Sequence, residues 1–177
     1  MRYFLIYFTV LCLLISVNSS AKGVYQSNAD FLKEVFNGDI PITQMLWILG
    51  DIKKGATSIL GEKPAQLRVR YWRKKQQTAW ILEEVGKEKL ITVGLLVENN
   101  QLHQIKVLAF RESRGWEVKE PFFLEQFFQI QLTPELQLDH SIDGISGATL
   151  SVRALKKLAR LALYYHMQII TQDYSSR

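Results

Sequence analysis

The stretch Leu90-Ile91-Thr92-Val93-Gly94-Leu95-Leu96-Val97 is nearly continuously apolar, and Glu98-Asn99-Asn100-Gln101 follows it directly. A short apolar run bounded by turn residues predicts a buried strand, and the polar segment after it predicts a hairpin turn. The partner strand of this hairpin is expected over Leu102 to Phe110. A buried antiparallel pair therefore forms the centre of the predicted sheet.

Two further strands are predicted upstream, because the period of the sequence changes at Gln66. From there apolar and charged residues alternate through Tyr71, as in a half-exposed strand, and Thr78 to Val85 forms the next run. Polar residues at 74–77 and 86–88 mark the turns between these strands. Four consecutive strands joined by short turns predict an antiparallel meander.

Helices are predicted before and after the meander in the chain. Ser27 opens a capped helix that ends at Asn37-Gly38, and apolar residues recur at helical spacing between Asp39 and Gly55. A long helix is predicted from about Ser151 to Ile169. Its sheet-facing stripe is expected to be Val152, Leu155, Leu158, Ala159, Ala162, Tyr165 and Ile169. The fold class is therefore α+β, a single domain in which an antiparallel sheet of about four or more strands carries N-terminal helices and a long C-terminal helix.

Two segments connect the last strand to this helix. The charged run Arg111 to Trp116 is expected at the rim of the sheet, where functional residues often collect. Glu120 to Phe128 predicts a short helical stretch whose rings belong mostly to the core, with one or two available to a ligand.

The run Asp143-Gly144-Ile145-Ser146-Gly147-Ala148-Thr149 leads directly into the long helix. Gly147 and Ala148 have almost no side chain, so their N–H groups can approach a ligand closely, and a helix N-terminus adds donors and a positive dipole end. No lysine follows the glycine as it would in a P-loop. The polar groups are instead the carboxylate of Asp143 and the hydroxyls of Ser146 and Thr149. The pattern indicates a phosphate site at which a hydroxyl serves for attachment.

This seven-residue run resembles the flavinylation motif of the FMN-binding domain family, which includes flavin-carrying subunits of sodium-pumping NADH:quinone reductase and Rnf-type complexes. The resemblance implies that Thr149 carries FMN covalently through a phosphoester. It also implies that an ApbE-type flavin transferase reads the other motif residues, Asp143, Ser146, Gly147 and Ala148.

A second similarity lies upstream, where Glu112-Ser113-Arg114-Gly115 resembles the family's Glu-Thr-Pro-Gly loop with arginine in place of proline. The resemblance as a whole covers roughly residues 66 to 169. It places Glu112 and the aromatic face of Trp116 beside the flavin.

Helix capping is the alternative interpretation of the motif loop, since Ser and Thr commonly cap helices and Gly commonly precedes them. Ser151 is the candidate cap if Thr149 is esterified. Cations in the first turns oppose the helix dipole unless an anion lies nearby, which makes Arg153 the candidate phosphate neighbour. The later basic residues, Lys156, Lys157 and Arg160, are interpreted as a solvated face.

The N-terminus resembles a secretory signal, in which Met1-Arg2-Tyr3 precedes an apolar run and small residues end at Ala21. Cleavage there would leave Lys22 as the first mature residue, and an uncleaved anchor is the alternative. The single cysteine, Cys12, lies within this segment, so no disulfide, thiolate metal site or haem attachment is expected in the mature protein. The three histidines are scattered, and no metal centre is expected.

The chain is therefore divided into a signal peptide (1–21), an N-terminal helical segment (22–65), an FMN-binding domain (66–171) and a tail (172–177). Its formal net charge of +5 is spread along the sequence, which argues against a nucleic-acid partner. The expected function is electron transfer by a covalent FMN in the periplasm or another extracytoplasmic space, with membrane association as an open alternative. The expected redox partner is a cytochrome or a quinone-linked reductase.

Such a protein is expected to be a component of a redox system more than a stand-alone enzyme. Two other functions fit the residues, a flavin-free accessory or interaction domain and a noncovalent FMN reductase. Colour separates the first from the main interpretation, and release of the flavin on unfolding separates the second.

Overall fold

Five antiparallel strands form one sheet in the order β1-β2-β3-β4-β5 in the computed structural model, which describes residues 23–175. The strands are β1 (Thr43–Trp47), β2 (Arg68–Lys74), β3 (Gln77–Val85), β4 (Leu90–Glu98) and β5 (Gln101–Phe110). The four-stranded meander predicted from the sequence is thus confirmed as β2 to β5. The predicted signal peptide, residues 1–21, lies outside the described residues.

Strand β1 corrects the prediction of a helix between Asp39 and Gly55. Leu46 of β1 lies opposite Val69 of β2, and the two face the core, whereas Met45 and Trp47 are exposed. The helix of this region, α3, begins later and runs over Gly50–Leu60. Pairing with β2 therefore outweighs a helical spacing that extends over only a few residues.

One face of the sheet is covered by α2 (Asn28–Val35), whose N-cap is Ser27 as predicted. The Ser27 hydroxyl accepts a hydrogen bond from the N–H of Asp30 at 3.1 Å. Apolar side chains of this helix pack on β3, β4 and β5 to form a small core, made of Phe31, Leu32, Val35, Phe36, Ala79, Leu96 and Leu108.

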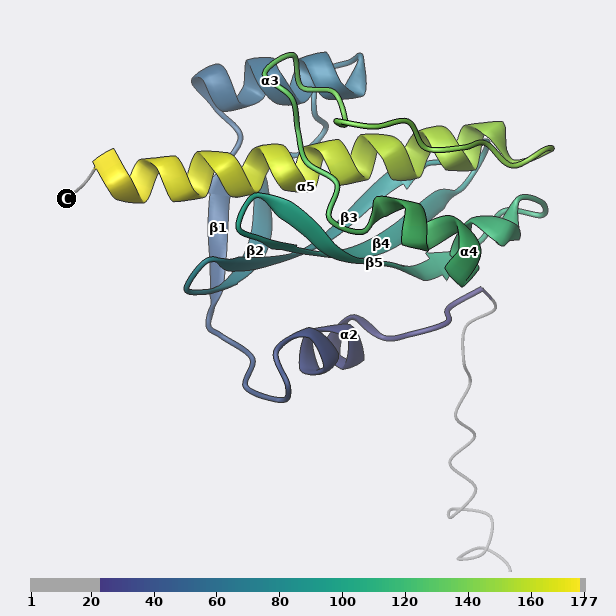
Figure 1. Ribbon diagram of the computed structural model, residues 1–177, viewed down its shortest axis with the longest axis horizontal. Coiled ribbons are helices and arrows are strands. Elements are labelled where there is room, and N and C mark those ends of the chain that lie inside the picture. Colours follow the sequence, from purple (N-terminus) through teal and green to yellow (C-terminus); the bar gives the residue numbers. More distant parts are fainter. Residues whose placement is uncertain (1–22, 176–177) are drawn as a thin grey trace, which may run out of the picture.

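The other face of the sheet carries the main core and the long helix α5 (Thr149–Ser175). Figure 1 shows that α5 lies between the sheet and a second layer, made of α3 and the irregular chain that follows α4 (Pro121–Leu124). The predicted stripe is buried, and so are Leu161, Leu163 and Tyr164 on other sides of the helix. Cover on both sides explains why α5 is apolar around most of its circumference.

The α+β class, the single domain and the long C-terminal helix agree with the prediction. None of the helices within residues 23–175 is long and apolar enough to cross a membrane.

Candidate functional site

The motif loop is a tight turn at the start of α5. The N–H of Ala148 donates to the carbonyl of Ile145 at 3.0 Å, and Gly147 has a φ of +80°. A left-handed third residue with this hydrogen bond is the arrangement of a type II turn, which favours glycine. A Cβ at Gly147 would meet no heavy atom within 4 Å, so the turn is open on that side.

Thr149 is the first residue of α5, two residues earlier than predicted, and its side chain is exposed. Ser151 is therefore not the cap and lies buried in the first turn. Asp143, Ser146 and Gly147 are exposed, whereas Ala148 is buried against the main core. The structure thus presents the motif's polar groups to solvent and anchors the loop through Ala148.

Gln126 holds the loop from the opposite side. Its side-chain Oε1 accepts from the N–H of Asp143 at 2.7 Å, and its carbonyl lies 3.2 Å from Nε2 of His140. Ile142, between these two residues, is buried in the main core. The first residue of the motif, Asp143, is therefore held in place by Gln126 and by the buried Ile142. No sequence pattern marked Gln126 as part of the site.

The upstream loop and the motif meet at Gly115. This glycine has a φ of +83°, and a Cβ there would lie 3.1 Å from Oγ of Ser151 and 3.2 Å from Cβ of Ala148. Only a glycine accommodates both the backbone conformation and the close approach. The two stretches that carried the family resemblance are therefore in contact, although Gly115 and Ala148 are 33 residues apart in the chain.

Glu112 holds a neighbouring turn. Its Oε1 accepts hydrogen bonds from the N–H groups of Lys87, Glu88 and Lys89, at 2.5, 2.7 and 2.9 Å. Partial burial raises the pKa of Glu112, but these N–H groups outweigh that and hold it below its ordinary value. The carboxylate thus fixes the β3–β4 turn beside the motif, and its expected contact with the flavin stays a prediction.

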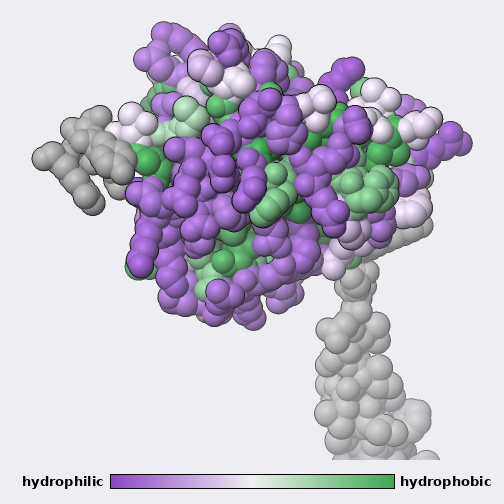
Figure 2. All heavy atoms as spheres, in the orientation of Figure 1, coloured by the Kyte–Doolittle hydropathy of each residue, from purple (hydrophilic) through white to green (hydrophobic). Residues whose placement is uncertain are grey.

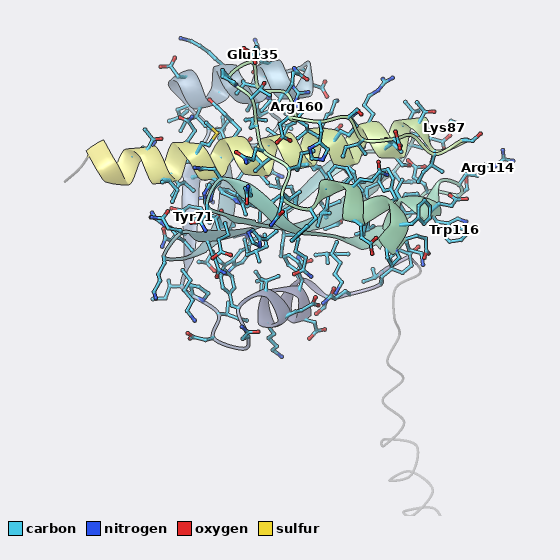
Figure 3. The ribbon with its side chains drawn as sticks, in the orientation of Figure 1. Tyr71, Lys87, Arg114, Trp116, Glu135 and Arg160 are labelled. Atoms are coloured by element: carbon cyan, nitrogen blue, oxygen red, sulfur yellow. The ribbon has the colours of Figure 1, made fainter. Side chains whose placement is uncertain are left out.

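Basic side chains gather around this end of the molecule. Figure 3 shows Lys87, Arg114 and Trp116 together at the end of the fold where α5 begins. Arg153 is exposed and lies one helical turn after Thr149 on the same face of α5. By contrast, Lys157 lies 3.7 Å from Glu84, and Nε of Arg160 donates to the carbonyl of Leu136 at 2.6 Å. These two residues are therefore not a purely solvated face, and Arg153 is the cation available to an anion at Thr149.

Exposed apolar side chains border the same region. Trp116 is 48% exposed and Phe122 is 63% exposed, and Leu150, next to Thr149, is 39% exposed. Figure 2 shows hydrophobic atoms at the surface over α4, which carries Phe122. The Trp116 ring lies 5.4 Å from Nζ of Lys119, so the predicted aromatic face is only partly open.

The fold and this site define an α+β domain that presents an exposed hydroxyl at a helix N-terminus within a basic surround, which suits a phosphate-bearing ligand. Within residues 23–175, no group of three or more His, Cys, Asp or Glu is placed to hold a metal ion.

Residues 86–164 match the family model of the FMN-binding domain. This part of the chain is therefore similar to the FMN-binding domain family, as the resemblance implied. The match begins at the β3–β4 turn and includes the Glu112 loop, the whole motif and half of α5. No curated protein and no solved structure matches the chain.

Proposed function

We propose that this protein is exported and carries one FMN on Thr149 through a phosphoester, for electron transfer outside the cytoplasm. The observation that carries the proposal is the exposed Thr149 hydroxyl at the first position of α5, at the end of a complete motif in a chain similar to the FMN-binding family. The exposure of Asp143 and Ser146 supports recognition by a flavin transferase, because the enzyme must contact the loop from outside.

Attachment needs only one reactive atom from this chain. Thr149 Oγ1 attacks the FMN phosphorus of FAD in the active site of the ApbE-type transferase, so that a bond from Oγ1 to phosphorus forms. The phosphorus–oxygen bond of the pyrophosphate bridge breaks, AMP leaves, and the hydroxyl proton passes to a base of the transferase. No net oxidation occurs in this step.

The residues around Thr149 fit a phosphoester that stays in place. A phosphate at the start of α5 lies at the positive end of the helix dipole, and Arg153 is one turn away. FMN supplies the redox chemistry when it is bound, and the chain supplies attachment and a fixed loop. The exposed apolar residues beside the motif, Trp116, Phe122 and Leu150, are where we place the extracytoplasmic redox partner, a cytochrome or a quinone-linked reductase.

The test is production of the protein with and without a flavin transferase, followed by purification under denaturing conditions. We expect flavin fluorescence to migrate with the unfolded chain only when the transferase is present. A coloured native protein that loses all flavin on unfolding would instead identify a noncovalent FMN protein. A chain that stays colourless in both cases would overturn the assignment of a flavin carrier.

A further inference from the structure

A second surface of the fold combines exposed apolar side chains with arginines, and it belongs to the ribbon of β1 and β2. Directly opposite residues of an antiparallel pair share a face, so Met45 with Arg70 and Trp47 with Arg68 lie on the side away from the core. Trp47 is 54% exposed, and Leu49, at the end of the ribbon, is 56% exposed. We call Met45, Trp47, Leu49, Arg68 and Arg70 the ribbon patch.

The ribbon patch is uncovered because the sheet divides beside it. β2 pairs with β3 only from Tyr71 opposite Trp80 to Lys74 opposite Gln77, and the remainder of β2 pairs with β1 alone. A groove of about 920 Å³ separates β2 from β3. Arg68 and Arg70 line one side, Glu83 and Glu84 line the other, and Glu62 and Lys63 lie in the segment before β2. Helix α2 packs on β3 and β4, and Trp72 of β2 packs against its apolar cluster, whereas Met45, Trp47, Arg68 and Arg70 stay exposed.

The charge of the ribbon decides which partner fits it. β1 and β2 together contain four Lys and Arg residues and no Asp or Glu. Lys74 is paired with Asp39 at 2.6 Å, and Nε of Arg73 donates to the carbonyl of Lys75 at 2.9 Å. Arg68 and Arg70 are the cations of the patch. Across the groove, Glu83 accepts a hydrogen bond from the Thr92 hydroxyl at 2.7 Å. An apolar surface with Trp and Arg is suited to the boundary between lipid head groups and acyl chains, where tryptophan concentrates and cations meet anionic lipids.

We propose that the ribbon patch docks on the surface of an anionic lipid bilayer. Trp47 and Leu49 enter the head-group layer, and Arg68 and Arg70 contact lipid phosphates. Figure 3 shows Tyr71 of β2 and Trp116 at opposite sides of the molecule, so the ribbon lies apart from the motif end. The surface is independent of the flavin site and does not rest on the proposed function.

The test uses the full chain with vesicles whose acyl chains carry bromine, which quenches nearby tryptophan. The tryptophans are Trp47, Trp72, Trp80 and Trp116, and none lies in residues 1–22, so quenching reports on the domain alone. Vesicles of phosphatidylcholine with about 30 mol% phosphatidylglycerol, an anionic lipid that gives the surface a negative potential, are compared with vesicles of phosphatidylcholine alone. We expect quenching only with the anionic lipid, lost in Trp47→Phe and retained in Trp116→Phe.

Charge variants supply the second readout. The double variant Arg68→Gln/Arg70→Gln should need more anionic vesicles for the same quenching, by about fivefold for each arginine. Lys87→Gln/Lys89→Gln removes the same charge at the other end of the molecule and should change little. The proposal would be overturned if quenching is lost in Trp116→Phe and weakened in the lysine double variant. Equal quenching with both lipids would also overturn it. If vesicles cause no quenching and the protein forms a dimer that Trp47→Phe dissociates, the proposal would be overturned. The ribbon patch would then bind a second copy of this chain.

Discussion

Glu112 is a residue whose position in the fold explains its chemistry. One carboxylate oxygen accepts from three consecutive backbone N–H groups of the β3–β4 turn. Such an arrangement favours the ionised form, and the three hydrogen bonds become weaker if the charge is removed. Glu112 stands three residues before Gly115, which contacts the start of α5. Glu112 therefore acts as a positioning residue for the motif end of the molecule.

Glu112→Gln should lower the free energy of unfolding by about 1–2 kcal/mol, because hydrogen bonds to a charged acceptor are the stronger ones. Because the pKa of Glu112 is below its ordinary value, its stabilisation is present at neutral pH and is lost as pH falls below about 4.5. Urea titrations at pH 7 and pH 3.5 measure both effects. Glu88→Gln, a change in the same turn, is the control and should stay within about 0.5 kcal/mol. An equal effect of the two variants would contradict the positioning role.

His166 is buried, and its Nδ1 lies 2.8 Å from the Thr78 hydroxyl, which also accepts from Trp80 Nε1 at 2.9 Å. Its Nε2 has no hydrogen-bond partner among the described residues. Burial lowers the pKa of His166 to about 4, and the charge of Arg73 adds to this. The folded protein therefore keeps this imidazole neutral at pH values where the unfolded chain binds the proton.

Stability should fall as pH is lowered from about 6.5 toward about 4, because the unfolded state takes up the proton first. The full loss from this group is about 3 kcal/mol at 1.36 kcal/mol per unit. Unfolding free energies at pH 7 and pH 5, where most carboxylates stay ionised, measure it. The slope should be smaller in His166→Asn and unchanged in the exposed control His140→Asn. A slope that is the same in both variants would count against a buried neutral His166.

At the scale of elements, the predictions succeeded where a segment carries its own signals. Each strand from β2 to β5 has an apolar run and a polar turn, and Ser27 marks the start of α2. β1 was missed because Leu46, Ile48 and Leu49 also satisfy a helical spacing, and only the pairing with β2 decides between the two.

The end of α3 was missed for a packing reason. Gly55 was interpreted as a helix stop, but it lies inside α3, where a Cβ would come within 2.3 Å of the Tyr164 ring of α5. The glycine allows the two helices to approach, and the Tyr164 hydroxyl donates to the carbonyl of Asp51 at 3.0 Å. The motif could be predicted from its own residues. The contacts of Gly115 and Gln126 could not, because they join segments that only the tertiary fold brings together.

The contact between Gly115 and α5 can be tested by a matched pair of substitutions. Gly115 and Gly61 share a φ of +83°, but a Cβ at Gly61, the C-cap of α3, would meet nothing within 4 Å. Gly61→Ala should cost only the backbone strain, about 1–2 kcal/mol. Gly115→Ala should cost more and should reduce flavin loading, since it pushes the upstream loop away from Ala148. Thermal unfolding and flavin content measure the pair, and normal loading of an equally stable Gly115→Ala protein would argue against the contact.

For the whole molecule, residues 23–175 form one layered body in which the motif end and the ribbon patch lie at opposite sides (Figure 1, Figure 3). The family match covers residues 86–164, so β1, β2, β3 and both N-terminal helices lie before it. These added elements carry no motif residue. The strands complete the sheet, α3 covers α5, and α2 covers the opposite face of the sheet. A separate surface on them is therefore free to serve a different partner from the flavin site.

Export is the prediction that belongs to the whole chain. The pattern from Met1 to Ala21 leads us to expect the protein outside the cytoplasm with Lys22 as its first residue. Cell fractionation and N-terminal sequencing measure this outcome. A full-length product that stays in the cytoplasm would remove the reason for a covalent flavin, since a cytosolic pool could replace FMN that dissociates.

The central claim is that Thr149 is the point of flavin attachment. Thr149→Ala removes the nucleophile. Even the loss of a capping hydroxyl costs only about 0.5–2 kcal/mol, and Thr149 is the first residue of α5 and not its cap, so the fold should survive. Ser146→Ala and Asp143→Asn keep the nucleophile and should lose flavin only in part, through weaker recognition by the transferase.

The most direct measurement is the intact mass of each denatured protein after production with the transferase. The wild type should gain the mass of one FMN less one water, and Thr149→Ala should keep the mass of the bare chain. A denaturation-resistant FMN adduct on the Thr149→Ala protein would contradict the account.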